Sequence, residues 1–273
     1  MSFSRSFSSR QSRRDPFRTR DSEVSTVLSL VSLGNHAKTV HNEEKYISFC
    51  LKSIFELDGF GESEIIVVDN ASEDNTDGIV RENFPQVKLI QEVRKGTGWA
   101  RQAGFSASKG EILAFIDADN VLPKNWLKQA EEILLKYPNG VAYSGPYDFK
   151  FGEISTFLIN FYYIFMMTFI SGIFNFFGVA ATLLGGNMII KRYALEKIGG
   201  FDTHITFWGD DTLIAKRLRK VGPVYFLRSF RAQSSIRRLA KGGMFKLAFL
   251  YPINALWVIL FNKPFTKSSK AIR

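Results

Sequence analysis

The sequence predicts an α/β fold in which a mostly parallel sheet carries helices on both faces. Short apolar runs alternate along the chain with segments whose apolar residues recur at helical spacing, and this alternation is typical of such sheets. Several strand candidates are unbroken apolar runs, which indicates strands buried on both faces. With 273 residues, of which 45% are hydrophobic, the chain is long enough to bury a sheet of this kind.

The predicted elements begin at Val24. β-Branched and leucine residues favour a strand over residues 24–33, and Ile47, Cys50 and Ile54 lie on one face of a predicted helix over residues 44–57. The further predicted strands are residues 64–69, 87–91, 111–116 and 141–144, with another before Lys191. The further predicted helices are residues 75–82, 98–108, 126–136 and 212–221.

Two of these strands lead into a carboxylate. The run EIIVVD ends with Asp69, and the run EILAFI is followed by Asp117. In open α/β sheets, ligands bind beyond the carboxyl ends of the strands, so we expect both side chains at a binding edge. Asp69 would there accept a hydrogen bond from a base or a ribose hydroxyl. The alternative is that Asp69 caps the next helix.

Asp117 and Asp119 are two residues apart in an extended segment, so both side chains point to the same side. Two carboxylates so close together repel each other unless a cation lies between them or their partners. Hard oxygen ligands suit Mg²⁺ or Mn²⁺, which usually also bind water and substrate phosphates. The alternative is a polar turn, which Asn120 and Pro123 would complete.

Two further groups of residues are candidates for chemistry. The basic, glycine-rich stretch from Arg94 to Arg101 opens a helix and would suit a diphosphate, although it could also be an ordinary basic loop. Asp210 and Asp211 precede an amphipathic helix. As N-terminal acids they would stabilise that helix, and a carboxylate fixed at a helix start is also rigid enough to act as a general base.

These stretches together resemble family 2 glycosyltransferases of the GT-A fold. The resemblance covers roughly residues 24–225, and the order and spacing of its motifs are more specific than any single motif. The motifs of the nucleotide-binding half are HNEE (41–44), VVDNASEDNT (67–76), GTGWARQAG (96–104) and FIDADN (115–120). Those of the acceptor half are GGNMIIKRYALEKIGGFD (185–202) and WGDDTLIAKRL (208–218).

The resemblance implies a role for each matching residue of the nucleotide-binding half. Glu43 and Asp69 would contact the nucleoside, and Arg101 the diphosphate. Asp117 would hold the ribose or a metal-bound water, and Asp119 would ligate the divalent metal, Mg²⁺ or Mn²⁺. The segment LGNHAKTV separates the first strand from Glu43, where the family has a shorter connection, so the register of that strand stays open.

In the acceptor half, the resemblance implies that Asp211, the second acid of its pair with Asp210, is the catalytic base. One carboxylate for the base and another for the metal fits inversion in a single displacement. Processive members carry Gln-x-x-Arg-Trp, whereas Gln233 is followed here by SSIRR, so transfer of a single sugar is expected.

The domain organisation follows from charge and apolar runs. We expect a disordered basic tail over residues 1–22 and a glycosyltransferase domain over residues 23–235, with its halves at 23–145 and 146–235. A basic and apolar segment over residues 236–273 is expected to associate with a membrane. Residues 212–273 contain fourteen Lys or Arg and no acidic residue.

The apolar segment 154–184 contains no Lys, Arg, Asp or Glu and exceeds the length of a bilayer span. A single span there would put Asp119 and Asp211 on opposite sides of a membrane. We therefore expect a hairpin, a re-entrant or interfacial helix pair that contacts lipid or a lipid-linked acceptor, or alternatively a buried core helix. Residues 247–262 are expected to form an interfacial helix.

The expected partners are a nucleotide-diphospho-sugar donor, a sugar or lipid-linked acceptor and a membrane surface at the cytoplasmic face, with no nucleic acid. The basic tail alternates charge with long apolar runs, which is unlike a nucleic-acid recognition element. The other alternative is a catalytically silent membrane-bound scaffold or nucleotide-binding module, and intact Asp119 and Asp211 argue against it.

Overall fold

The computed structural model describes residues 28–33, 43–61, 63–149, 160–161, 163–169, 172, 183–205, 209–234, 244–263 and 265. The predicted tail over residues 1–22 and most of the apolar segment 154–184 lie outside these ranges.

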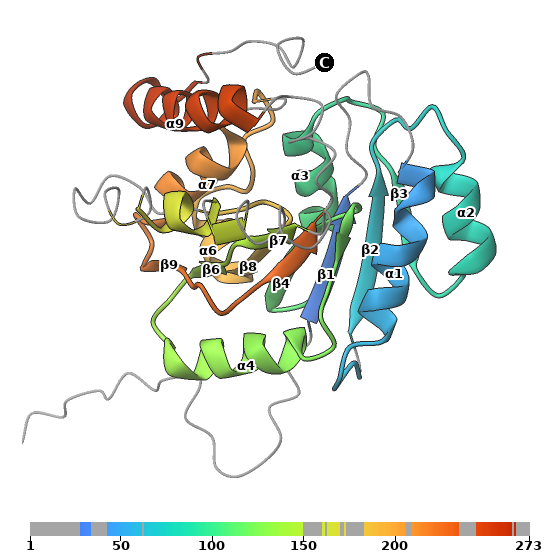
Figure 1. The fold of residues 1–273 in the computed structure, drawn as a ribbon. Coiled ribbons are helices and arrows are strands. Elements are labelled where there is room, and N and C mark those ends of the chain that lie inside the picture. Colours follow the sequence, from blue (N-terminus) through green and yellow to red (C-terminus); the bar gives the residue numbers. More distant parts are fainter. Residues whose placement is uncertain are drawn as a thin grey trace, which may run out of the picture.

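A seven-stranded sheet forms the centre of the described fold, in the order β3-β2-β1-β4-β8-β6-β9 (Figure 1). Every strand of this sheet except β8 runs in the same direction, because β8 pairs antiparallel with both β4 and β6. The prediction of a mostly parallel sheet is therefore confirmed. The strands are β1 (Leu28–Leu33), β2 (Glu64–Asp69), β3 (Lys88–Gln91), β4 (Ile112–Asp117), β6 (Ala142–Ser144), β8 (Asn187–Lys191) and β9 (Val224–Phe226).

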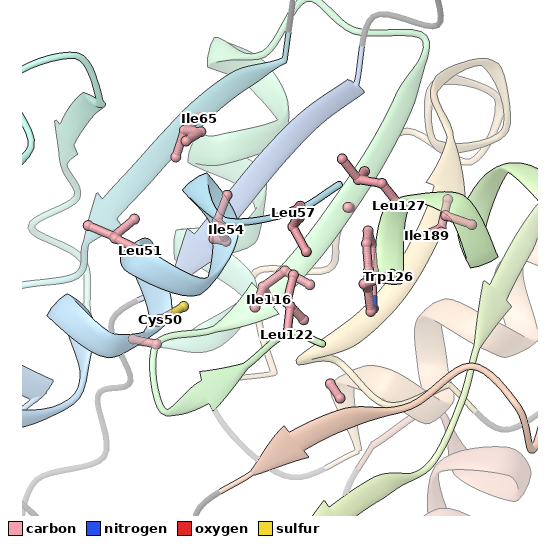
Figure 2. Packing of buried hydrophobic residues seen from close by; sticks show 14 of the residues in the cluster. Cys50, Leu51, Ile54, Leu57, Ile65, Ile116, Leu122, Trp126, Leu127 and Ile189 are labelled. Carbon is pink, nitrogen blue, oxygen red and sulfur yellow. The ribbon is translucent and has the colours of Figure 1, made fainter. Parts of the chain in front are cut away.

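Helices cover both faces of this sheet. Along β2, Ile65 and Val67 join a core with residues of α1, α2 and α4, whereas Ile66 and Val68 join a second core with residues of α3, α6 and α7. Figure 2 shows the first core, in which Trp126 packs beside residues of β4 and β8. The helices are α1 (Ile47–Phe55), α2 (Thr76–Asn83), α3 (Thr97–Ala107), α4 (Trp126–Lys136), α6 (Arg192–Lys197) and α7 (Asp210–Leu218).

A second sheet of three short strands was not predicted from the sequence. It has the order β5-β10-β7, formed by β5 (Asn120–Val121), β10 (Ala232–Ser234) and β7 (Tyr147–Phe149). Strands of two or three residues are too short to show a periodic pattern. This sheet matters for function because it places Tyr147 and Asn120 beside the end of β4.

Two predicted helix starts differ from the structure. The first predicted helix begins at Ile47 rather than at residue 44, because Glu43–Lys45 form a separate 3-10 turn, η1. α7 begins at Asp210 rather than at residue 212, so both acids belong to its first turn.

The last described helix, α9 (Met244–Phe261), packs on α7. Val258 forms a small core with Ile205 and Leu213, and the Lys216 ammonium donates hydrogen bonds to the Ile259 carbonyl at 2.5 Å and to Asn262 Oδ1 at 2.8 Å. The helix predicted over residues 247–262 is thus present. Within the residues described, no helix is both long and apolar enough to cross a bilayer.

Candidate active site

The ends of neighbouring parallel strands bring two predicted site residues to one edge of the sheet. Leu33 of β1 pairs with Val68 on one side and with Asp117 on the other. Asp69 follows Val68, so Asp69 and Asp117 lie at the carboxyl edge on either side of β1. This is the placement expected from the sequence.

Three acidic side chains from distant parts of the chain meet at one arginine. The Arg101 guanidinium donates hydrogen bonds through Nη1 to Asp210 and, at 2.7 Å, to Asp211 Oδ1. Its Nη2 lies 3.9 Å from Asp117 Oδ1. The Arg101 side chain is only 4% exposed, whereas that of Asp211 is 31% exposed. The cluster therefore has a buried cation, Arg101, and a partly exposed carboxylate, Asp211.

The charges of this cluster depend on one another. Burial lowers the pKa of Arg101, but the carboxylates of Asp210, Asp211 and Asp117 outweigh that effect and raise it above its ordinary value. Burial and the neighbouring Asp211 charge raise the pKa of Asp210 to about 6, against the opposing effect of Arg101. Asp211 is the more exposed acid of the pair, with 31% of its side chain exposed against 13% for Asp210.

A Gly185-Gly186 turn before β8 closes one side of the cluster. The Gly185 N–H donates to Asp211 Oδ2 at 2.9 Å, so Asp211 is fixed through both of its oxygens. A Cβ at Gly185 would lie 1.7 Å from Arg101 Nη2, and one at Gly186 would lie 2.6 Å from Asp117 Cγ. Neither position has room for a side chain, which explains the two glycines of the GGNM motif.

Two polar residues of the site were missed by the sequence analysis. Tyr147 accepts the Gly186 N–H at 3.0 Å, and Asn120 donates to the Gly186 carbonyl at 2.7 Å. Burial and the charges of Asp117 and Asp211, together with Tyr163, raise the pKa of Tyr147 well above its ordinary value. Tyr147 follows Gly145-Pro146 without any periodic pattern, and its position became evident only from the second sheet.

The predicted diphosphate loop is held mainly by contacts within the protein. Arg94 forms two hydrogen bonds with the Glu92 carboxylate, at 2.8 and 2.7 Å, and Lys95 pairs with Glu73 at 2.8 Å. Buried Asn70 donates to the Glu92 and Arg94 carbonyls and accepts the Gly96 N–H. These contacts favour the alternative of a basic structural loop for Arg94 and Lys95, and they make Asn70 its anchor.

Of the remaining predicted residues, Asp69 and Asp119 lie near the carboxyl ends of β2 and β4, whereas the contact of Glu43 with a nucleoside stays a prediction. The Asp69 carboxylate is buried and accepts the Ser72 N–H at 3.0 Å, so it shapes the turn before α2. Asp119 is buried in the turn between β4 and β5, and Glu43 begins η1. The contacts of Arg101 are with the acids of the cluster, so its contact with a diphosphate stays a prediction.

The donor set fits a magnesium or manganese ion that is completed by a ligand. In the described ranges, no group of three or more His, Cys, Asp or Glu could hold a metal by itself. Asp117 and Asp119 offer two carboxylates in one turn. Mg²⁺ is usually held by one or two carboxylates together with substrate phosphates and water, so these two residues match that mode.

Comparisons with known proteins find similarity to glycosyltransferases. YdaM, a probable glycosyltransferase of Bacillus subtilis, is 31% identical over 207 residues, which cover 70% of this chain and 47% of YdaM. The mannosyltransferase PcManGT of Pyrobaculum calidifontis, solved with GDP-Man and Mn²⁺, superposes with a TM-score of 0.63 at 23% identity, over 87% of this chain and 64% of its own. Staphylococcus aureus TarS with UDP-GlcNAc gives a TM-score of 0.56 at 20% identity, over 77% of this chain and 58% of its own.

The fold and the acidic cluster define the GT-A class of transferase. The glycosyl transferase family 2 model matches residues 39–199, which is more than half of the chain. The chain belongs to glycosyl transferase family 2. It spans about half of the length of YdaM.

Proposed function

We propose that this protein transfers a single sugar from a nucleotide-diphospho-sugar to an acceptor hydroxyl, with inversion and with help from a divalent metal. The observation that supports this most strongly is the meeting of Asp117, Asp210 and Asp211 around Arg101 at the carboxyl edge of the sheet. The solved relatives with GDP-Man and UDP-GlcNAc support a donor of this chemical class.

Asp211 is the base in this proposal. Its Oδ1 accepts from Arg101 and its Oδ2 from Gly185, and each oxygen keeps a lone pair for the proton of an acceptor hydroxyl. Removing that proton turns a weak nucleophile into one able to attack the anomeric carbon. Arg101 holds Asp211 in place through Nη1, and the Asp210 carboxylate offsets part of the positive charge of Arg101.

Asp117 and Asp119 would hold Mg²⁺ or Mn²⁺ against the donor diphosphate. When bound there, the ion supplies Lewis-acid stabilisation of the charge that develops on the leaving nucleoside diphosphate. Asp69 and Glu43 would contact the nucleoside. Arg101 lies between the Asp117 carboxylate and the base, so the two halves of the reaction share one positioning residue.

The acceptor in this proposal is lipid-linked or lies at a membrane surface on the cytoplasmic face. Phe161, Phe165 and Phe169 stack along one side of the helical residues 160–161 and 163–169, with ring centroids 6.5 and 6.3 Å apart, and each is 53–64% exposed. The same segment reaches the site, because the Tyr163 ring stacks on Tyr147. An exposed aromatic row suits the interfacial region of a lipid surface.

The donor and the metal can be tested together by thermal denaturation with GDP-mannose, UDP-N-acetylglucosamine and other nucleotide sugars. We expect one donor to raise the melting temperature in the presence of Mn²⁺ or Mg²⁺ and to lose this effect with EDTA, because a ligand that binds only the folded state stabilises it. The Asp119→Ala variant should lose the metal-dependent shift. Asp58→Ala, at an exposed carboxylate away from the site, should keep it.

No stabilisation of the wild type by any nucleotide sugar with metal would contradict the proposed function. A full shift in Asp119→Ala would contradict only the assignment of the metal ligand.

A further inference from the structure

Tyr147 has a hydroxyl proton that no protein group receives among the described residues. Its oxygen accepts the Gly186 N–H, and this is the hydroxyl's one hydrogen-bond partner in that part of the chain. A tyrosine hydroxyl can accept and donate at the same time, so its proton remains available to a ligand. The Tyr147 ring packs against the rings of Phe149 and Tyr163, whose centroids lie 6.2 and 6.5 Å from its own.

The Tyr147 hydroxyl binds the glycine turn that also contacts Asp117 and Asp211. Gly186, which holds it, is in contact with Asp117, and the preceding Gly185 holds Asp211. A tyrosine hydroxyl is neutral at physiological pH, so Tyr147 offers a proton as a hydrogen-bond donor rather than a charge.

Tyr147 lies on the side of the site that the proposed function gives to the acceptor. It lies on β7, which pairs with β10, and its ring stacks on Tyr163 of the segment that carries the exposed phenylalanines. The nucleotide-side residues Asp69 and Asp117 instead end β2 and β4 of the main sheet.

Resting on the proposed function, we propose that the Tyr147 hydroxyl donates a hydrogen bond to an oxygen of the acceptor and so aligns the attacking hydroxyl with Asp211. Tyr147 is then a residue that contacts the substrate in the transfer step. Hydrolysis of the donor by water depends on Tyr147 less, because water needs no such alignment.

The test compares Tyr147→Phe with the wild type in three measurements. The first is the metal-dependent thermal shift with the donor found for the wild type. The second is the slow release of its sugar to water. The third is transfer to octyl β-D-glucoside or decyl phosphate, whichever the wild type uses. We expect Tyr147→Phe to keep the donor-induced thermal shift and to release sugar to water at a rate within about threefold of the wild type. Its kcat/KM for the acceptor should fall about tenfold through a higher acceptor KM, because one hydrogen bond is lost.

Tyr143→Phe is the matched control. The Tyr143 hydroxyl donates toward the carbonyls of Tyr137 and Gly140 within the core, away from the site. Its removal should lower the melting temperature and leave acceptor KM unchanged, which separates a structural effect from a substrate contact.

Two results would overturn the inference. The first is transfer by Tyr147→Phe at the wild-type rate and acceptor KM. The second is an equal loss of donor binding, release to water and transfer, which would place the hydroxyl on the donor side or in the framework. Failure of the wild type to bind any nucleotide sugar would instead refute the proposed function, and this inference with it.

Discussion

At the scale of single residues, the balance of charge around Arg101 decides how the acids can act. One guanidinium faces Asp210, Asp211 and Asp117, so two negative charges are in excess when all three acids are ionised. Burial is the largest cause of the raised pKa of Asp210. The excess charge is also the feature that would draw a divalent cation to the turn at Asp117 and Asp119.

The raised pKa of Asp210 predicts a specific pH dependence of stability. Its pKa of about 6 in the folded protein lies above the ordinary value of 3.8, so the folded state binds this proton more tightly than the unfolded state does. The resulting stabilisation is complete below about pH 4 and is lost as the pH rises through 6. We expect this stabilisation to be on the order of 3 kcal/mol.

Melting temperatures of the wild type and Asp210→Asn between pH 4 and pH 8 measure this effect, because the variant lacks the titrating group. The wild type should lose stability relative to Asp210→Asn between pH 4 and about pH 6.5. A difference that stays constant, or that changes in the opposite direction, would show that Asp210 does not titrate in this range.

At the scale of elements, α7 connects the base to the last described helix. Asp210 and Asp211 form its first turn, and Gly209 before them has a φ of +82°, which favours glycine. A Cβ at Gly209 would also lie 2.4 Å from Val258 Cγ2 of α9. The inner face of α9 thus supports the start of α7, while Leu256, Leu260 and Phe261 remain exposed.

The row of exposed phenylalanines predicts binding to lipid. In flotation with vesicles of phosphatidylcholine and phosphatidylglycerol, we expect the triple variant Phe161→Ser, Phe165→Ser and Phe169→Ser to bind at least about tenfold more weakly, because each ring loses apolar burial in the membrane interface. The matched control carries Phe49→Ser, Val93→Ser and Leu135→Ser, which change exposed apolar residues on other elements. Equal flotation of the first triple variant and the wild type would contradict a role for the row.

At the scale of the whole molecule, the sequence predicted most of the main sheet because its central strands are long apolar runs, whereas the three-residue strand β9 was missed. The run EIIVVD became β2 without any change of bounds, and the aspartates that end β2 and β4 lie at the expected edge. Pairing partners are not encoded in a local pattern, so the antiparallel direction of β8 and the whole second sheet required the structure.

The candidate site shows the same division. Asp117, Asp210 and Asp211 were predicted from their positions after strands and before a helix, and the structure brings them together. The link through Arg101 and the roles of Tyr147 and Asn70 were missed, because they depend on contacts between residues 26 to 110 positions apart. A local sequence pattern does not predict contacts between residues so far apart in the chain.

The turnover of Asp211→Asn tests the central claim most directly, since that claim assigns the base to one carboxylate in the acidic cluster. Asparagine keeps the size of the side chain but cannot take a proton from the acceptor. We expect sugar transfer to fall by about 10²- to 10⁴-fold, with the affinity for the donor nucleotide changed by no more than about threefold. Near-normal turnover in Asp211→Asn would contradict the account.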